Sequence, residues 1–229
     1  MAMLTQISHD TFQDIRFGSP PSPAPLGEIE GGFGFISSEF SYSKDSEIYG
    51  EDEPAEYVYQ VIRGAVRSYK LLSDGRRQIS AFHLAGEIFG LESGDVHRLA
   101  AEAVVDTTVR LVKRSCLEKA AATDLRVLWK LFNVTTRDLK HAEDHMLLLG
   151  RKTALERVAA FLLEMDRRLT VAGMLALPMC RRDIGDYLGL TLETVSRALS
   201  QLHEQGILDF SGARQILLRN RQRLQTMDA

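Results

Sequence analysis

The period of the hydrophobic pattern changes along the chain, and its first part is typical of β structure. Tyr57, Tyr59 and Val61 alternate with their neighbours, as a half-buried strand requires. The strand-like runs are Phe33–Ile36, Tyr57–Ile62, Ala65–Leu72, Gln78–Phe82 and Val104–Val112. Asp74 and Gly75 stand between two of these runs and signal a tight hairpin. Many short strands at even spacing predict a β-sandwich or β-roll.

The next part has the period of a helix. Apolar or small residues follow one another at spacings 3-4-3-4-3-4-3, which is the a/d seam of a heptad pattern. The seam consists of Leu125, Leu128, Phe132, Thr135, Leu139, Ala142, Met146 and Leu149. We expect its partner to be the same helix of a second subunit. The alternative is that the stripe packs on the β domain of its own chain, and both can hold if Trp129, Leu131 and Leu148, which lie off the seam, face that domain.

A third stretch, Cys180–Leu199, divides into two short helices around a tight turn. Gly189 stands where the first helix must end, because glycine takes the left-handed conformation without a Cβ penalty. Thr191 can then cap the second helix. Val195 and Leu199 lie four residues apart, so they share a face that can pack on the first helix.

The outward side of this second helix mixes hydrogen-bond donors and acceptors near the helix N-terminus. It carries Leu192, Glu193, Ser196 and Arg197. A helix that reads base edges in a major groove has this character, so we interpret the stretch as a helix-turn-helix. The alternative is an ordinary corner between two helices. Ile207–Phe210 and Gln215–Leu218 follow as two strand-like runs and predict the wing of a winged helix.

The remaining segments complete an α+β chain of four parts. The proline-rich run Gly18–Pro25 predicts an extended or mobile lead, although a docking segment and a short helix over Asp10–Arg16 stay open. Thr153–Leu169 has the pattern of an amphipathic helix, and Gln222–Ala229 is polar and expected to fray. The predicted parts are a lead segment (1–32), a β-roll (33–122), a long dimerisation helix (123–150) and a winged helix-turn-helix (151–229).

Composition excludes several classes of protein. Of 229 residues, 45% are hydrophobic and 26% charged, and no apolar run approaches the ~18–20 residues that span a bilayer. No signal peptide is visible, and two distant cysteines, Cys116 and Cys180, fit the reducing cytoplasm and cannot supply a four-cysteine iron–sulfur cluster. The net charge is −3, and between Cys180 and Leu224 seven arginines face five acidic residues. Any affinity for nucleic acid must therefore come from the placement of the charges.

A β-roll, a long helix and a winged helix-turn-helix in this order resemble the CRP/FNR family of transcription regulators. The most specific matches are Asp183–Arg197, with Glu-Thr-x-Ser-Arg in its second helix, and the roll segment Gly86–Gly90. The Glu-Thr-x-Ser-Arg pattern is similar to the FNR branch, and the lack of cysteine in residues 1–50 points to the FixK type, known from rhizobial low-oxygen and nitrogen-fixation control. The resemblance implies a homodimeric regulator, mainly an activator, whose partners are double-stranded DNA and RNA polymerase, and not an enzyme.

The resemblance also implies a palindromic site of TTGA type and a role for each residue. Arg197 would donate two hydrogen bonds to guanine, and Glu193 would accept from an exocyclic amine. Ser196 and Leu192 would contact thymine, and Arg181 would bind phosphate. The predicted DNA-binding set is Arg181, Thr191, Leu192, Glu193, Ser196 and Arg197.

The roll is expected to act without a cofactor or metal. Cyclic-AMP-binding members have an Arg-Ser pair after the Gly-Glu motif, whereas Arg98 is followed here by leucine and preceded by Asp95. A haem sensor stays open because His83 and His97 are present. The rivals are a regulator of the same family gated by a cyclic nucleotide or another ligand, and a cupin-like metalloenzyme, for which the six histidines are too scattered along the sequence.

Cys180 is a candidate redox residue. It stands just before the first helix of the motif, where it caps poorly, and Arg181 and Arg182 flank it. A thiol at a helix N-terminus beside two arginines is expected to have a depressed pKa and to oxidise more easily. The hypothesis is that oxidation places negative charge near the DNA and weakens binding; the alternative is an inert small residue. Cys116 is expected to be a buried core thiol.

Overall fold

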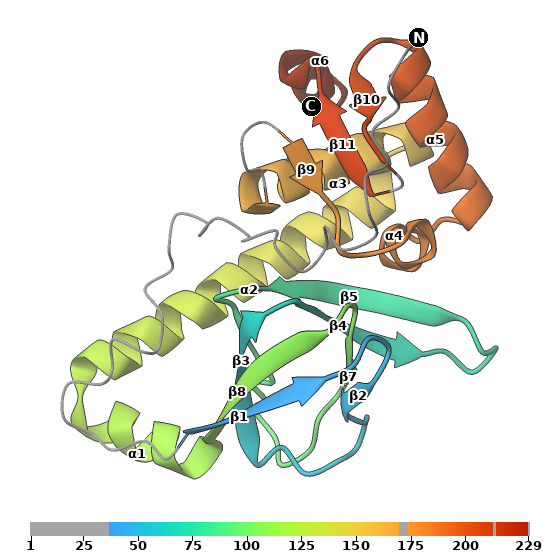
Figure 1. The fold of residues 1–229 in the computed structure, drawn as a ribbon. Coiled ribbons are helices and arrows are strands. Elements are labelled where there is room, and N and C mark those ends of the chain that lie inside the picture. Colours follow the sequence, from blue (N-terminus) through green and yellow to red (C-terminus); the bar gives the residue numbers. More distant parts are fainter. Residues whose placement is uncertain (1–36, 170–173, 213, 229) are drawn as a thin grey trace, which may run out of the picture.

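A computed structural model describes residues 37–169, 174–212 and 214–228 of the chain. The predictions for the lead segment and for the strand Phe33–Ile36 lie outside these residues. The N-terminal half is the expected β-roll, in which two four-stranded antiparallel sheets face each other (Figure 1). One sheet has the order β1-β8-β3-β6 and the other β2-β7-β4-β5. The strands are β1 (Ser37–Tyr42), β2 (Glu47–Tyr49), β3 (Tyr57–Arg63), β4 (Ala65–Leu71), β5 (Arg77–Leu84), β6 (Ile88–Phe89), β7 (Ala100–Ala103) and β8 (Thr107–Lys113).

The hairpin between β4 and β5 forms where the sequence places Asp74 and Gly75. Gly75 has a φ of 83°, which favours glycine, and the Asp74 carboxylate accepts a hydrogen bond from the Arg76 amide at 3.0 Å. The amide of Leu72 donates to the Arg76 carbonyl and closes the turn. The hairpin projects β5 beyond the roll, toward the C-terminal part of the chain (Figure 1).

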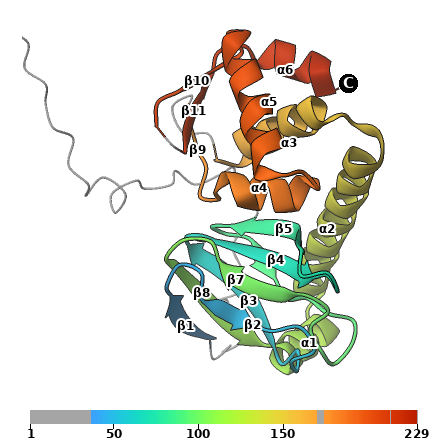
Figure 2. The same ribbon diagram turned by 90° about the vertical axis from the view of Figure 1, so that its right-hand side faces the viewer.

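Two helices follow the roll, α1 (Arg114–Thr123) and the long α2 (Leu125–Arg151). Asp124 begins α2 by accepting a hydrogen bond from the Arg126 amide at 2.8 Å. From the side, α2 runs past the roll and up to the C-terminal helices (Figure 2). Leu131 and Leu148 pack on neighbouring cores as expected, but the prediction for Trp129 is wrong, since its side chain is exposed.

The C-terminal part is a winged helix-turn-helix. It contains α3 (Ala154–Leu169), β9 (Met174–Ala176), α4 (Arg181–Leu188), α5 (Leu192–Glu204), β10 (Leu208–Phe210), β11 (Gln215–Leu218) and α6 (Arg221–Asp228), with the strands in the order β10-β11-β9. The expected wing strands are thus present. The expectation that Gln222–Ala229 frays is wrong, because α6 packs against α3 and buries Leu224 completely.

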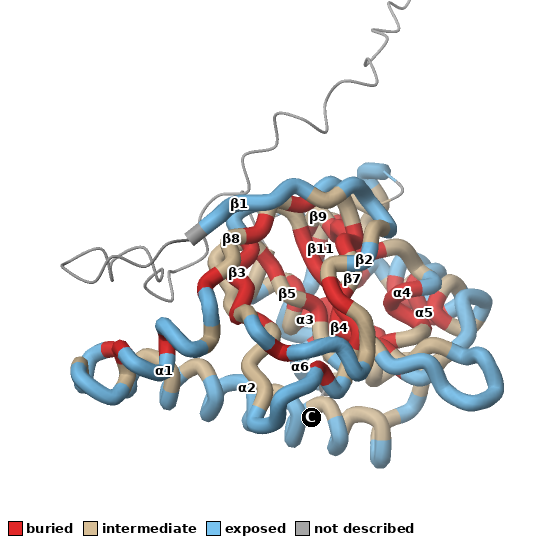
Figure 3. Tube along the Cα trace, turned by 90° about the horizontal axis from the view of Figure 1, so that it is seen from below, coloured by how far each residue is buried: buried red, intermediate tan, exposed pale blue. Residues whose placement is uncertain are grey.

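The roll and the winged part share one apolar core. Ile79 and Phe82 of β5 belong to the same buried cluster as Phe161 of α3 and Tyr187 of α4. The ring centroids of Phe82 and Tyr187 lie 5.3 Å apart. The periodicity treats these two parts as separate units, but α4 rests directly on the sheet. Figure 3 shows the buried segments of the roll and of α4 and α5, whereas α1 and much of α2 are exposed.

Candidate DNA-binding site

The turn between α4 and α5 depends on two glycines. Gly189 ends α4 with a φ of 63°, in the left-handed region expected from the sequence. Gly185 lies one turn earlier, where an added Cβ would come 2.6 Å from the Leu190 carbonyl oxygen. The chain can therefore fold back tightly, and α5 follows α4 after three residues.

Helix α5 is anchored on one side and open on the other. Thr191 caps it by accepting a hydrogen bond from the Thr194 amide at 3.2 Å, as predicted. Val195, Ala198, Leu199 and Leu202 form its buried face. Because these side chains fix the rotation of the helix, the residues on the opposite side must face the solvent.

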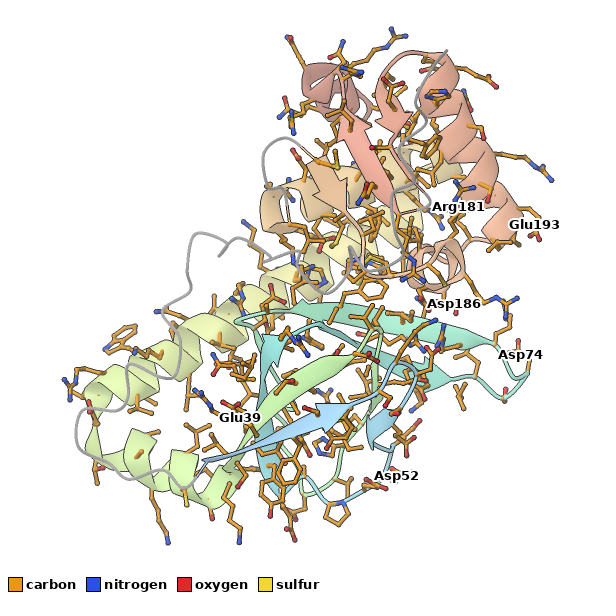
Figure 4. The ribbon with its side chains drawn as sticks, in the orientation of Figure 1. Glu39, Asp52, Asp74, Arg181, Asp186 and Glu193 are labelled. Carbon is orange, nitrogen blue, oxygen red and sulfur yellow. The ribbon has the colours of Figure 1, made fainter. Side chains whose placement is uncertain are left out.

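The exposed side of α5 carries Leu192, Glu193 and Arg197, while Ser196 is half-buried. Figure 4 shows Glu193 at the end of α5 that lies next to α4, on the outer edge of the molecule. The pKa of Glu193 is lowered, first by a hydrogen bond from its own backbone amide and then by the Thr191 hydroxyl, Arg197 and Arg182. The carboxylate is thus ionised and can accept hydrogen bonds. The charge of Arg182 at this position is a contribution that the sequence prediction missed.

Arg181, at the start of α4, contacts both α5 and β10. Its Nη1 atom donates to the Ser196 hydroxyl at 3.3 Å, and its guanidinium lies 5.6 Å from the ring centroid of Phe210 on β10. Arg181 is half-buried as a result. The sequence did not predict the contact with Phe210, because an aromatic residue in a strand is usually expected to pack in the core. The structure thereby brings Arg181 and Ser196 of the predicted set together.

Cys180 is the N-cap residue of α4 and is half-buried. Its backbone amide donates to Oδ2 of Asp183 at 3.1 Å, and its Sγ donates to the same oxygen at 3.0 Å. Asp183, rather than the thiol, therefore satisfies the start of the helix. The expectation that Cys116 is a core thiol is wrong, since it is exposed on α1.

A cavity of about 440 Å³ lies between the roll and helices α2 and α3. Glu87 keeps the turn before β6 by accepting from the Leu84 amide at 2.9 Å, and it also binds Arg168 at 2.8 Å. Arg98, at the cavity rim, binds Glu92 at 2.7 Å. Burial lowers the pKa of His83, which lines the cavity, to about 4, so this ring is neutral at pH 7.

Within residues 37–169, 174–212 and 214–228, three or more His, Cys, Asp or Glu side chains nowhere cluster closely enough to hold a metal ion. The structure does bring His141 and His145 of α2 to Tyr187 of α4, although histidines look scattered along the sequence. Among the described residues, no helix is long and apolar enough to cross a membrane.

Comparisons with known proteins agree with this architecture. Residues 39–124 match the model of the cyclic nucleotide-binding domain, and residues 156–227 match the Crp-like helix-turn-helix domain. The nitrogen fixation regulation protein FixK of Azorhizobium caulinodans is 46% identical over 82% of this chain and 78% of its own length. FixK of Rhizobium meliloti is 42% identical over 77% of this chain and 80% of its own.

A solved structure supports the same assignment. FixK2 from Bradyrhizobium japonicum is 79% identical, with a TM-score of 0.83 over 85% of this chain and 98% of that one. Its similarity extends through the roll, α2 and the winged helix-turn-helix. The chain therefore belongs to the CRP/FNR family of transcription regulators and is of the FixK type.

Proposed function

We propose that this DNA-binding transcription regulator acts as a homodimer in the cytoplasm, reads palindromes of TTGA type and mainly activates transcription through contact with RNA polymerase. The observation that carries the proposal is the exposed polar side of α5, backed by a fully buried apolar face. Relatives named as transcriptional activators support the sign of regulation. A two-fold axis between two such helices predicts half-sites whose centres lie roughly 34–36 Å apart.

Each exposed side chain suits one part of the site. Arg197 can donate two hydrogen bonds to guanine, Glu193 can accept from an exocyclic amine, and Leu192 can contact a thymine methyl. Arg181 and Thr191, near the turn, are expected to contact the phosphate backbone, and Ser196 is expected to contact thymine. Selection of binding sites from random duplexes tests this: we expect a two-fold TTGA-type sequence, and a half-site without symmetry or without the G·C pair would contradict it.

The dimer contact proposed for α2 follows from its exposed seam. Leu125, Phe132, Leu139 and Met146 each leave more than half of their surface in solvent within one chain. The stripe does not pack on its own roll, and exposed apolar patches of this kind mark protein interfaces. Leu139→Arg should give monomers in analytical ultracentrifugation and abolish cooperative binding to the palindrome. Thr136→Arg, on the same helix but off the seam, is the matched control and should stay dimeric.

We also propose that oxidation of Cys180 inactivates DNA binding. Its sulfur lies 3.0 Å from Oδ2 of Asp183, and Arg181 is the next residue in the chain. A sulfinate or sulfonate would repel both the Asp183 carboxylate and the DNA phosphates. Peroxide should weaken binding by the wild type and by Cys116→Ser but not by Cys180→Ser. Equal loss in Cys180→Ser would contradict the proposal.

A second candidate is a regulator gated by a small ligand, favoured by the cavity of about 440 Å³. Against a cyclic nucleotide, Arg98 already pairs with Glu92 and the next residue lacks a hydroxyl. Titration calorimetry with cyclic AMP and cyclic GMP separates the two candidates. A nucleotide that binds with measurable heat and also raises the affinity of the protein for DNA would favour the ligand-gated regulator.

A further inference from the structure

We propose that Arg67 and Arg77 of the β-roll are positioning residues for DNA reading, because they hold helix α4 by its two aspartates. The inference rests on the proposed reading of DNA by α5, which is joined to α4 by the short turn at Gly189. Arg67 lies on β4 and Arg77 at the start of β5, so both belong to the hairpin that projects from the roll.

The contacts converge on the first turns of α4. Oδ1 of Asp183 accepts from Arg67 at 3.1 Å and from Arg77 at 2.7 Å. Arg77 also binds Asp186, one turn further along, with Nε 3.0 Å from Oδ2. Figure 4 shows Asp186 at the junction of α4 and the hairpin, whose tip carries Asp74. Arg67 and Asp183 expose only 6% and 5% of their side chains, so water screens their attraction little.

Other side chains of the roll fix the positions of Arg67 and Arg77. Arg67 donates to Glu102 of β7 at 3.0 Å and to Asp45 at 2.9 Å. Arg77 lies over the ring of Tyr69, 5.5 Å from its centroid. The guanidinium of Arg67 is held by the carboxylates of Glu102 and Asp45. Because its donors lie in one plane with fixed directions, it cannot keep its bond to Asp183 if α4 moves. The pairs therefore fix a direction as well as a distance.

The other end of α4 is fixed by different elements. The hydroxyl of Tyr187 donates to Glu164 of α3 at 3.2 Å and lies 3.3 Å from Nε2 of His141 on α2. The carbonyl of Tyr187 accepts from Gln78 of β5 at 3.2 Å. With both ends held, α4 can neither slide along β5 nor pivot on the apolar contact between Phe82 and Tyr187. The orientation of α5 relative to the roll, and therefore relative to the seam of α2, is then already fixed in the protein without DNA.

This arrangement has a consequence for regulation. If only a fraction of the molecules has the orientation that binds DNA, the apparent affinity for DNA is reduced by that fraction. Buried charge pairs contribute little net stability, but they penalise orientations in which one charge is left unpaired. The roll can in this way place the reading helices through its own side chains, without a ligand in the cavity.

The test compares neighbouring arginines of the same hairpin in the full-length protein. Arg77→Ala should weaken binding to the selected palindrome about tenfold, and Asp186→Ala, which removes one of the two Arg77 contacts, should weaken it less. The double variant should lose no more than Arg77→Ala alone. Arg76→Ala is the matched control, since Arg76 pairs with Asp74 in its own turn and, among the described residues, with no group of α4. Arg77→Lys, which keeps the positive charge beside Asp183 and Asp186 but not the planar fork, should retain part of the affinity. Fluorescence anisotropy on specific and scrambled duplexes measures the binding.

Two further readouts separate positioning from folding. Thermal unfolding should show that the roll stays intact in each variant, while amide hydrogen exchange should become faster in α4 and in the start of β5. Wild-type affinity in Arg77→Ala, equal losses in Arg76→Ala, or fully additive losses would overturn the proposal. A wild type that prefers no palindrome would contradict the proposed base reading by α5. Unchanged hydrogen exchange in α4 of Arg77→Ala would contradict the positioning role of Arg67 and Arg77 and leave the base reading untouched.

Discussion

The two helices of the helix-turn-helix differ sharply in their surroundings. Helix α4 is enclosed by β5, α3 and α2, and its two aspartates are paired with roll arginines. Helix α5 buries one face in the winged domain and leaves the other open. Both helices look amphipathic in sequence, with polar residues on one side. The aspartates of α4 are paired with roll arginines, whereas Glu193 and Arg197 of α5 remain exposed.

The difference teaches that a polar helix face has two possible uses. On α5, Glu193 and Arg197 stay in water and can exchange it for base edges. On α4, Asp183 has already exchanged its water for two guanidinium groups and is therefore structural. The following predictions separate the two uses, from the largest expected effect to the smallest.

Asp183→Ala should cost the most, because it leaves Arg67 and Arg77 short of a buried partner and removes the hydrogen bond to the amide of Cys180. We expect the free energy of unfolding in urea to fall by about 3–5 kcal/mol. Asp186→Ala, on the more exposed side of the same helix, should cost about 1 kcal/mol or less. Equal costs for the two would mean that α4 is not held at Asp183.

Arg197→Ala should show the opposite behaviour. It should reduce the free energy of specific DNA binding by about 1–3 kcal/mol and relax discrimination at one base pair. Because Arg197 is exposed, the urea midpoint should stay within the error of the wild type. Mobility shifts on a panel of substituted half-sites measure this, and an equal loss on specific and scrambled DNA would contradict the assignment.

The neutral histidines around α4 should make stability depend on pH. Burial lowers the pKa of His83 and of His145 to about 4, below the value near 6.5 of an unfolded chain. The unfolded state then binds more protons, so stability falls as the pH drops below about 6.5 and levels off below about 4. Since each of the two residues keeps part of its surface in solvent, we expect about 1–2 kcal/mol for each.

The groups that face His83 act in both directions: Glu87 favours its charged form, while Arg168, His141 and Arg137 oppose it. His83→Gln and His145→Gln should flatten the dependence of the urea midpoint on pH between 4 and 6.5. A slope that survives in the double variant would place its origin elsewhere.

Leu192→Ala should have the smallest effect. Its side chain is 40% exposed and packs on no core, so folding should not change. Loss of contact with a thymine methyl should weaken binding by about 0.5–1 kcal/mol, and only on sites that have the methyl. Replacing thymine by uracil in the duplex removes the same methyl, and a Leu192→Ala variant that still distinguishes the two bases would rule out this contact.

The sequence alone predicted strands β3, β4, β5, β8, β10 and β11, helices α2 to α5, and the polar exposed face of α5. It did not predict β1, β2, β6, β7, α1 or α6. Period-two and period-3.6 patterns gave the strands, the long helix and the motif, because side chains repeat with the backbone geometry of each element. Gly189, Thr191 and the inward Val195 and Leu199 fixed the turn and the rotation of α5, since these are local requirements of capping and burial.

Only the tertiary structure decided what lies against the motif. Nothing in the spacing of Arg67 and Arg77 connects them to Asp183, more than a hundred residues away, because ion pairs between distant elements leave no period in sequence. The burial of Leu224, the exposure of Cys116 and the bond between Cys180 and Asp183 were hidden for the same reason. Local chemistry shows which helix can read DNA, but long-range packing sets the direction in which that helix points.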